Sequence, residues 1–293
     1  MASILSALLL CVAIPFGVVA MLFPQLVEHA PSQTNYRGRK VVSGLGIAWV
    51  VWLSFIWIGS VVLGFLEIEL PGWMSIVVSA FPLLMGTCAF GFFDDWAGDQ
   101  SAKGFKGHFR ELARGHLTTG MLKLMGIGLL SLATGVTLYD PFDPARLARI
   151  IFAALVIALS ANFMNLMDLR PLRASKTYVV GIVACAIALP LSGVVAGDWM
   201  QIAGLLLACM GPVVATWGPE RREIAMLGDA GANTMGALIG FLLSISLPIW
   251  LLGVLAGILL VANLLSEKLS FSKVIENIPP LRAIDMAFRR KDD

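Results

Sequence analysis

Gly91-Phe92-Phe93-Asp94-Asp95-Trp96 ends a long apolar run of the sequence with two adjacent carboxylates. The run itself, from about residue 73 to 93, is long enough for a membrane-spanning helix, which needs roughly 20 apolar residues. Adjacent ionised carboxylates repel each other, and proteins keep such pairs mostly where a divalent cation or a proton transfer uses them. The alternative interpretation is a solvated helix end. The polar motifs elsewhere in the chain bear on this choice.

The composition of the whole chain indicates a polytopic membrane protein. Of its 293 residues, 58% are hydrophobic and only 14% are charged, whereas about a quarter of a soluble domain is charged. The four cysteines all fall in apolar runs without the spacing of metal ligands, so we interpret them as small core residues. The first apolar run lacks a basic start and is predicted to be a retained span.

We predict an all-α fold with one transmembrane domain over residues 1–293, divided into a helical bundle (1–266) and a cytoplasmic interfacial tail (267–293). The tail mixes apolar and basic residues and is broken at Pro279-Pro280. It is predicted either to lie on the membrane surface as amphipathic segments or to be a solvated basic tail. The bundle is expected to hold about nine transmembrane helices, near residues 2–22, 43–64, 73–93, 117–138, 147–164, 177–195, 199–217, 233–247 and 249–266.

The distribution of lysine and arginine predicts the orientation. Alternate loops and the tail are rich in cations, whereas the opposite loops are mainly acidic and contain only Arg146 and Arg149 as cations. Because cytoplasmic loops carry the excess of positive charge, we expect the N-terminus outside and the C-terminus in the cytoplasm. Asp94 and Asp95 then face the cytoplasm.

A basic segment with interleaved aromatic residues follows the paired aspartates. It includes Lys106 and suits anionic headgroups or a phosphorylated substrate, although the orientation rule alone explains its charge. Lys123 lies inside the next predicted span, where a cation either extends to the interface or meets a phosphate. We interpret His108 and His116 as interfacial residues rather than catalytic ones.

Two further motifs lie at the same predicted face. Asn162, Asn165 and Asp168 recur every third residue at the end of a span, which indicates either a polar site or hydrogen bonds between helices. Asp229 follows Gly228 at the start of another span. This position predicts either a metal ligand or a residue of a capped helix start. An ion-coupled carrier is expected to place its acids near the bilayer centre. Acids at the span ends favour a reaction on a lipid headgroup instead.

These motifs, in this order, resemble the polyprenyl-phosphate N-acetylhexosamine-1-phosphate transferases. Phe92-Phe93-Asp94-Asp95 is similar to the family's paired-aspartate motif, and Asn162 to Asp168 to its Asn-x-x-Asn-x-x-Asp motif. Leu227-Gly228-Asp229 is similar to its Gly-Asp motif, and Arg37-Gly-Arg-Lys to its first cytoplasmic loop. The resemblance runs from about residue 37 to 290.

The resemblance implies a multi-pass enzyme of the bacterial cytoplasmic (inner or plasma) membrane, with its active site facing the cytoplasm. It would transfer a sugar-1-phosphate from a UDP-sugar to polyprenyl (undecaprenyl) phosphate, for the synthesis of cell-envelope polysaccharide. Its partners would be that lipid, the nucleotide sugar and the membrane, with a homodimer as one option and no nucleic acid. The implied cofactor is Mg²⁺, with Mn²⁺ as a substitute. Asn165 and Asp229 would be its ligands.

The resemblance also suggests roles for the other residues. Asp94, Asp95 and Asp168 would be the catalytic acids, with Asp94 or Asp95 orienting or deprotonating the acceptor phosphate. The expected substrate-binding residues are Lys106, Lys123, Asn162, Arg170 and Arg173.

The sequence departs from the family after Asp168, where Leu169-Arg170-Pro171-Leu172 replaces the usual Gly-x-Asp-Gly. The histidine motif of the translocases that use muramyl-pentapeptide is also missing, so that donor is not expected. Arg170 and Arg173 are candidates to meet the diphosphate instead. The alternatives to a transferase with another donor are a non-catalytic relative that binds polyprenyl phosphate or a partner, and an ion-coupled transporter.

Overall fold

The computed structural model describes residues 5, 7–98, 104–194 and 198–289. It is 78% helical, which confirms the all-α polytopic prediction. Among the described residues, seven helices are long and apolar enough to cross a membrane, or eight when the bent pair of α4 and α5 is taken as one span. The spans are η1 with α2 (Leu8–Ala13, Ile14–His29), α3 (Ile47–Phe65), α4 with α5 (Gly72–Ser79, Phe81–Ala97), α7 (Thr119–Leu138), α8 (Pro144–Met167), α9 (Arg173–Leu191), α10 (Trp199–Arg221) and α12 (Ile249–Ser266).

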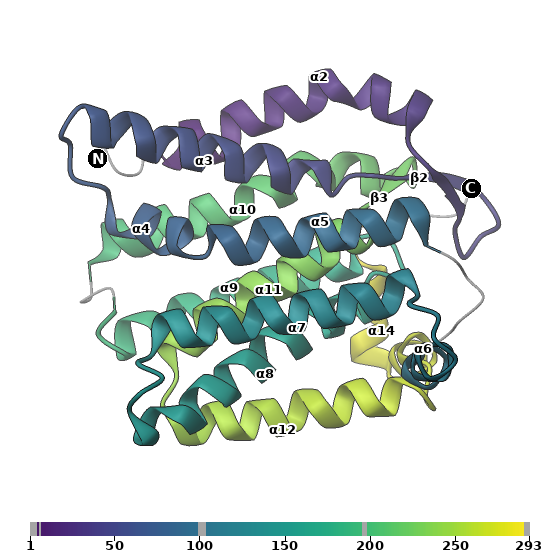
Figure 1. Ribbon diagram of the computed structural model, residues 1–293. Coiled ribbons are helices and arrows are strands. Elements are labelled where there is room, and N and C mark those ends of the chain that lie inside the picture. Colours follow the sequence, from purple (N-terminus) through teal and green to yellow (C-terminus); the bar gives the residue numbers. More distant parts are fainter. Residues whose placement is uncertain (1–4, 6, 99–103, 195–197, 290–293) are drawn as a thin grey trace.

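The remaining long helix, α11 (Gly228–Ser246), lies at the centre of the bundle, against α5, α8 and α9 (Figure 1). The sequence predicted a span from 233, but the helix begins at Gly228. It is not apolar enough to count among the candidate spans, so the described residues support seven or eight of the nine predicted spans. Its first turns carry Asp229 and Asn233, and Asn233 is only 1% exposed. Other helices rather than lipid therefore surround this polar start.

Glycines bring the neighbouring helices close to α11. A Cβ at Gly91 of α5 would lie 2.5 Å from the carbonyl oxygen of Asp229, and one at Gly236 would lie 2.1 Å from that of Ser160 in α8. Close backbone approach through small residues is a common way for membrane helices to associate. The contact at Gly91 matters for the site, because it lies one turn before Asp94.

A small sheet, which the sequence did not predict, ties two distant loops together. Strands β1 (Ser32–Thr34) and β2 (Lys40–Ser43) are antiparallel, and β2 pairs in parallel with β3 (Ala225–Met226) through Val42 and Ala225. The sheet fixes the chain just before α11. It lies at the end of the bundle where α5 ends and α7 and α11 begin, on the right of Figure 1 and here called the site end.

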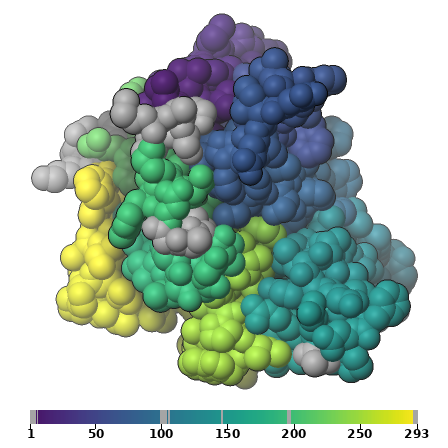
Figure 2. All heavy atoms as spheres, turned by 90° about the vertical axis from the view of Figure 1, so that its left-hand side faces the viewer, coloured from purple at the N-terminus to yellow at the C-terminus, as the bar shows by residue number. Residues whose placement is uncertain are grey.

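The C-terminal tail forms two short helices, α13 (Phe271–Asn277) and α14 (Pro279–Met286), separated at the predicted proline pair. The prediction of a merely solvated tail is wrong for this segment, because Ser272 and Asp285 are buried against the rest of the protein. Both helices and α6 (Gly104–Ala113) lie at the site end. The view onto the opposite end shows the teal α7–α8 region beside the lime α12 region, with the N-terminal helices above them (Figure 2).

Candidate functional site

Lys123 joins three helices at the site end. Its side chain extends from the second turn of α7, is only 8% exposed, and donates to Oδ2 of Asp94 in α5 at 2.6 Å. The same ammonium also pairs with Oδ2 of Asp229 in α11. Two of the sequence motifs and the unexplained intramembrane lysine therefore meet in one buried ion cluster. Such a cluster is costly to build unless its charges balance and its hydrogen bonds are made.

Asp95 binds the start of α11. One carboxylate oxygen accepts from the backbone N–H of Asp229 at 2.9 Å, and the other accepts from that of Ala230 at 3.0 Å. A carboxylate at a helix N-terminus satisfies free N–H groups and interacts favourably with the helix dipole. Both oxygens of Asp95 are thus already engaged, so the paired aspartates differ in role. Asp94 contacts the cation, whereas Asp95 holds the helix that carries Asp229.

Asp168 lies just after α8 and accepts from the N–H of Gly228 at 3.1 Å. Burial, and next the nearby charge of Glu220, raise the pKa of Asp168 well above its usual value of 3.8. Gly228 itself has a φ of 69°. A Cβ on it would lie 2.5 Å from Oδ2 of Asp95, so glycine is required between these two carboxylates.

Asn162 and Asn165 lie on the same side of the end of α8. Asn162 donates to Oδ1 of Asn263 in α12 at 2.5 Å, and Asn263 donates in turn to the carbonyl oxygens of Leu159 and Leu259. The interpretation as a hydrogen bond between helices therefore holds for Asn162, which also lines the cavity described next. Asn165 lines that cavity as well.

A cavity of about 470 Å³, here called the first cavity, opens at this cluster. A narrower pocket of about 100 Å³ continues from Lys123 and Asn162 between α7, α8 and α11, where Ile127 and Ala158 make it apolar. Seven of the ten predicted site residues line the first cavity: Asp94, Asp95, Lys123, Asn162, Asn165, Asp168 and Asp229.

A second cavity of about 460 Å³ shares Gln33, Asp168, Leu169 and Met226 with the first. Arg170 lines it, with its guanidinium 4.2 Å from the ring centre of Tyr36 and 3.0 Å from a carboxylate oxygen of Glu276. One predicted substrate-binding residue thus lies beside the first cavity rather than in it.

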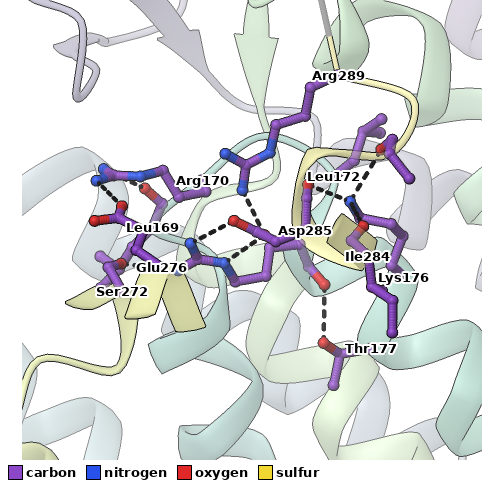
Figure 3. Close-up of polar contacts among 12 residues, drawn as sticks. Leu169, Arg170, Leu172, Lys176, Thr177, Ser272, Glu276, Ile284, Asp285 and Arg289 are labelled. Carbon is purple, nitrogen blue, oxygen red and sulfur yellow. Dashed lines mark hydrogen bonds and ion pairs between the residues drawn. The ribbon is translucent and has the colours of Figure 1, made fainter. Parts of the chain in front are cut away.

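The two other predicted substrate-binding residues lie elsewhere. Lys106 is exposed on α6 and lines neither cavity. Arg173 is 3% exposed and donates to both carboxylate oxygens of Asp285, at 2.8 and 3.0 Å. Figure 3 shows Asp285 between this part of α9 and Arg289, which also donates to it. Arg173 therefore fastens the tail to the bundle.

Lys176 and Ser272 complete this attachment of the tail. We call the whole cluster the tail latch; it consists of Arg173, Lys176, Ser272, Asp285 and Arg289. Lys176 donates to the backbone carbonyls of Ile284, Asp285 and Ala287, and Ser272 accepts from Arg173 at 2.8 Å. Although burial raises the pKa of Asp285, the hydrogen bond from Arg173 and the charge of Arg289 leave it below its usual value.

His108 was interpreted from the sequence as an interfacial residue, but it is a cavity residue. His108 lines the first cavity and lies within 2.7 Å of Oγ1 of Thr118. The local sequence contains only a weak signal for this, namely Thr118 and Gly120 at the start of the next helix. Glu267 and Gln33 also line the cavity.

The described residues contain no group of three histidine, cysteine, aspartate or glutamate side chains placed to hold a metal ion. Mg²⁺ does not need such a cage, because it is commonly bound by one or two carboxylates together with substrate phosphates and water. Asp229 and Asn165 provide a carboxylate and an amide in the same cavity. The lining thus contains oxygen ligands of the kind that Mg²⁺ prefers, beside the ammonium of Lys123.

Comparison of the sequence with protein-family models and with curated protein sequences finds no match. A functional assignment therefore depends on the motifs and on the geometry of the cavity.

Proposed function

We propose that this protein transfers a sugar-1-phosphate from a UDP-sugar to a polyprenyl phosphate at the cytoplasmic face of a membrane. The observation that carries the proposal is the Lys123 cluster. Residues more than a hundred positions apart, Asp94 and Asp229, share one buried ammonium beside a cavity of about 470 Å³. A buried ammonium held by partly buried acids in a cavity at a span end can meet phosphates that arrive at the membrane surface.

The proposed reaction is a phosphoryl transfer. An oxygen of the acceptor phosphate attacks the phosphorus attached to the sugar, and the bond between the two phosphates of the donor breaks. UMP leaves with the oxygen of that bond, and a lipid-linked sugar diphosphate remains. Catalysis of such a step depends mainly on positioning and on neutralising charge.

Each residue of the cluster has a role in this scheme. Lys123, held between two carboxylates, is available to exchange one of them for a phosphate oxygen. Asp94 would orient the acceptor phosphate or accept its proton, because its carboxylate lies in the cavity beside the ammonium of Lys123. Asp95 would act as a positioning residue, because the N–H groups of Asp229 and Ala230 occupy both its oxygens.

Asp229 and Asn165 would hold Mg²⁺, with phosphate oxygens of the donor and water as the other ligands. When bound, the ion neutralises charge on the diphosphate. Asp168 supports this half of the site by fixing the backbone at Gly228, next to Asp229.

The surroundings of the first cavity suit the two substrates. The narrow apolar pocket between α7, α8 and α11 would admit the beginning of the isoprenoid chain. The second cavity offers a wall for the nucleotide in Tyr36 and the guanidinium of Arg170, which lie beside the acids of its lining, Asp168, Glu220 and Glu223. Because this wall includes the segment that departs from the family, we expect it to determine which donor is used.

The proposal is tested with the full chain in lipid nanodiscs, undecaprenyl phosphate, Mg²⁺ and a broad panel of radiolabelled UDP-sugars. At least one donor should yield a lipid-linked product together with UMP, and D94N and D229A should yield neither. If no donor gives product while an active family enzyme does in parallel, the proposal is wrong. A cellular function that survives D229A would favour the non-catalytic alternative.

A further inference from the structure

His108 lies in a corner of the first cavity that is formed by residues outside the three motifs. It lines the cavity together with Gly120, Lys123 and Leu124 of α7. Among the described lining residues, Lys123 is the only lysine or arginine, and the acids are Asp94, Asp95, Asp168, Asp229 and Glu267. A phosphate entering this acidic cavity therefore needs donors besides the single ammonium.

Thr118 holds the ring of His108. Its Oγ1 lies 2.7 Å from Nδ1 of His108 and accepts, as the N-cap of α7, from the backbone N–H of Met121 at 3.2 Å. The hydroxyl proton is then free to bond to Nδ1. When the hydroxyl donates to Nδ1, the neutral ring carries its hydrogen on Nε2, since the bond at one ring nitrogen selects the state of the other.

Gly120 makes room for the ring edge that carries Nε2. A Cβ at this position would lie 2.4 Å from Cε1 and 2.6 Å from Nε2 of His108. Any other residue would push the ring away from α7, the helix that also carries Lys123. Nε2 has no hydrogen-bond partner within the part of the chain that the structure describes. In the tautomer with its hydrogen on Nε2, the ring presents a positioned donor that no described residue accepts.

The position of this corner indicates which phosphate it would meet. The helix α6 and the loop after it expose Phe109 (60%) and Leu117 (57%) beside basic residues, as interfacial segments do. The apolar pocket between α7, α8 and α11 begins at Lys123 and Leu124, which also line the cavity beside His108. A lipid phosphate at headgroup depth would place its charge here and its chain in that pocket.

We propose that His108, together with Lys123, binds the phosphate of a lipid monophosphate, with Thr118 as the residue that positions the imidazole. The proposal rests on the proposed function in taking this lipid to be the acceptor. It adds to that reaction a substrate-binding residue, His108, that lies outside the three motifs.

The test measures binding of farnesyl phosphate to the full chain in nanodiscs by calorimetry, without any nucleotide sugar. H108A should weaken binding about tenfold, the effect of losing one hydrogen bond to a charged group. T118V should weaken it less, because the ring remains but its tautomer and orientation are no longer fixed. G120A should weaken it although His108 is still present. Farnesol, which lacks the phosphate, should bind H108A and the wild type equally.

His116 provides the matched control. It is exposed, bonds to Glu111 and does not line the cavity, so H116A should bind farnesyl phosphate as the wild type does. H108Q, which keeps an N–H donor at similar reach, should recover part of the affinity and serves as the second variant if H108A does not fold. Affinity of H108A within twofold of the wild type, or an equal loss in H116A, would overturn the proposal.

Inorganic phosphate is the second arm. It should compete only weakly, because it lacks the chain that fills the apolar pocket. Equal affinity for inorganic and farnesyl phosphate would overturn the assignment to a lipid. The binding assay contains no sugar donor, so its result does not depend on transferase activity. If the protein binds farnesyl phosphate through His108 but transfers no sugar in the transferase assay, the proposed function is refuted and this binding site is still supported.

Discussion

Lys123 is the residue whose environment differs most from that of an ordinary lysine. Its ammonium lies between Asp94 and Asp229, and all three side chains are at most 23% exposed. The K123M substitution leaves two carboxylates in one buried site without their counter-charge. Removing one partner of a buried ion pair typically costs about 3–5 kcal/mol, mainly because a charge is left uncompensated.

We therefore expect K123M to lower the free energy of unfolding by about 3 kcal/mol. The triple variant D94N/K123M/D229N should recover most of this loss, since it leaves no buried charge in the cluster. Chemical or thermal unfolding of the detergent-solubilised protein measures both effects. K106M, which removes an exposed lysine of α6, is the control and should be nearly neutral. A K123M variant as stable as K106M would contradict the buried ion cluster.

At the scale of elements, the contact between α5 and α11 brings Asp94 to Asp229, and glycine makes it possible. G91A would place a Cβ within 2.6 Å of the backbone at Asp229 and Ala230, where backbone rather than a flexible side chain must move. We expect a loss of stability of about 1–3 kcal/mol, as for overpacking of other tight contacts. Transferase activity should fall further, because the two carboxylates separate.

Gly128 of α7 is the matched control, because a Cβ there would meet nothing within 4 Å. G128A should be neutral or slightly stabilising, since alanine favours the helix. Equal melting temperatures for G91A and G128A would show that the two helices are not held this closely.

The tail latch is a second contact between elements, joining α9 to α14, and its loss should change the stability of the protein. D285A leaves Arg173 and Arg289 buried without their shared carboxylate, so the tail should detach. We expect about 3 kcal/mol less stability and rapid proteolysis within residues 267–289. R146A removes an exposed pair with Asp143 and should cost less than about 1 kcal/mol. A protease-resistant tail in D285A would contradict the latch.

The latch also predicts a pH dependence. The folded pKa of Asp285 lies below its ordinary value of 3.8, so the ionised form is the one that stabilises the fold. Its contribution is complete above pH 3.8 and is lost as the pH falls through the lower folded value. The stability difference between the wild type and D285A should therefore persist at neutral pH and shrink only below pH 4. A difference that shrinks already near neutral pH would mean that another group holds the tail.

For the whole molecule, the distribution of charge predicts the orientation in the membrane. Phe142, in the loop between α7 and α8, is 91% exposed at the end opposite the site, and Lys273 is exposed on the tail at the site end. With the cation-rich site end inside, F142C should react with a membrane-impermeant thiol reagent in intact cells. K273C should react only after permeabilisation. The native cysteines are buried and should give little background.

The reverse labelling pattern would place the cavity outside the cell, where nucleotide sugars are not supplied, and would exclude the proposed reaction. Labelling of both variants in intact cells would mean that the reagent has crossed the membrane. A cytoplasmic control protein labelled in the same cells distinguishes that case.

The sequence by itself determined the helical membrane class, the approximate positions of the spans other than α11, the break at Pro279-Pro280 and the polar span ends. These features depend on local hydropathy and charge, which can be read from short stretches of the sequence. It also singled out seven residues that line the first cavity. Local patterns do not indicate which side chains become partners across helices.

Only the tertiary structure decided which partner each of those side chains contacts. Asp94 and Asp95 are equivalent in the sequence, yet one meets Lys123 and the other binds the start of α11. Arg173 looked available for a phosphate but is paired with Asp285, and His108 looked interfacial but lines the cavity. In each case the decisive partner lies on another helix or beyond a turn. Its distance in space depends on how the helices pack around the glycine contacts of α11, which no local pattern specifies.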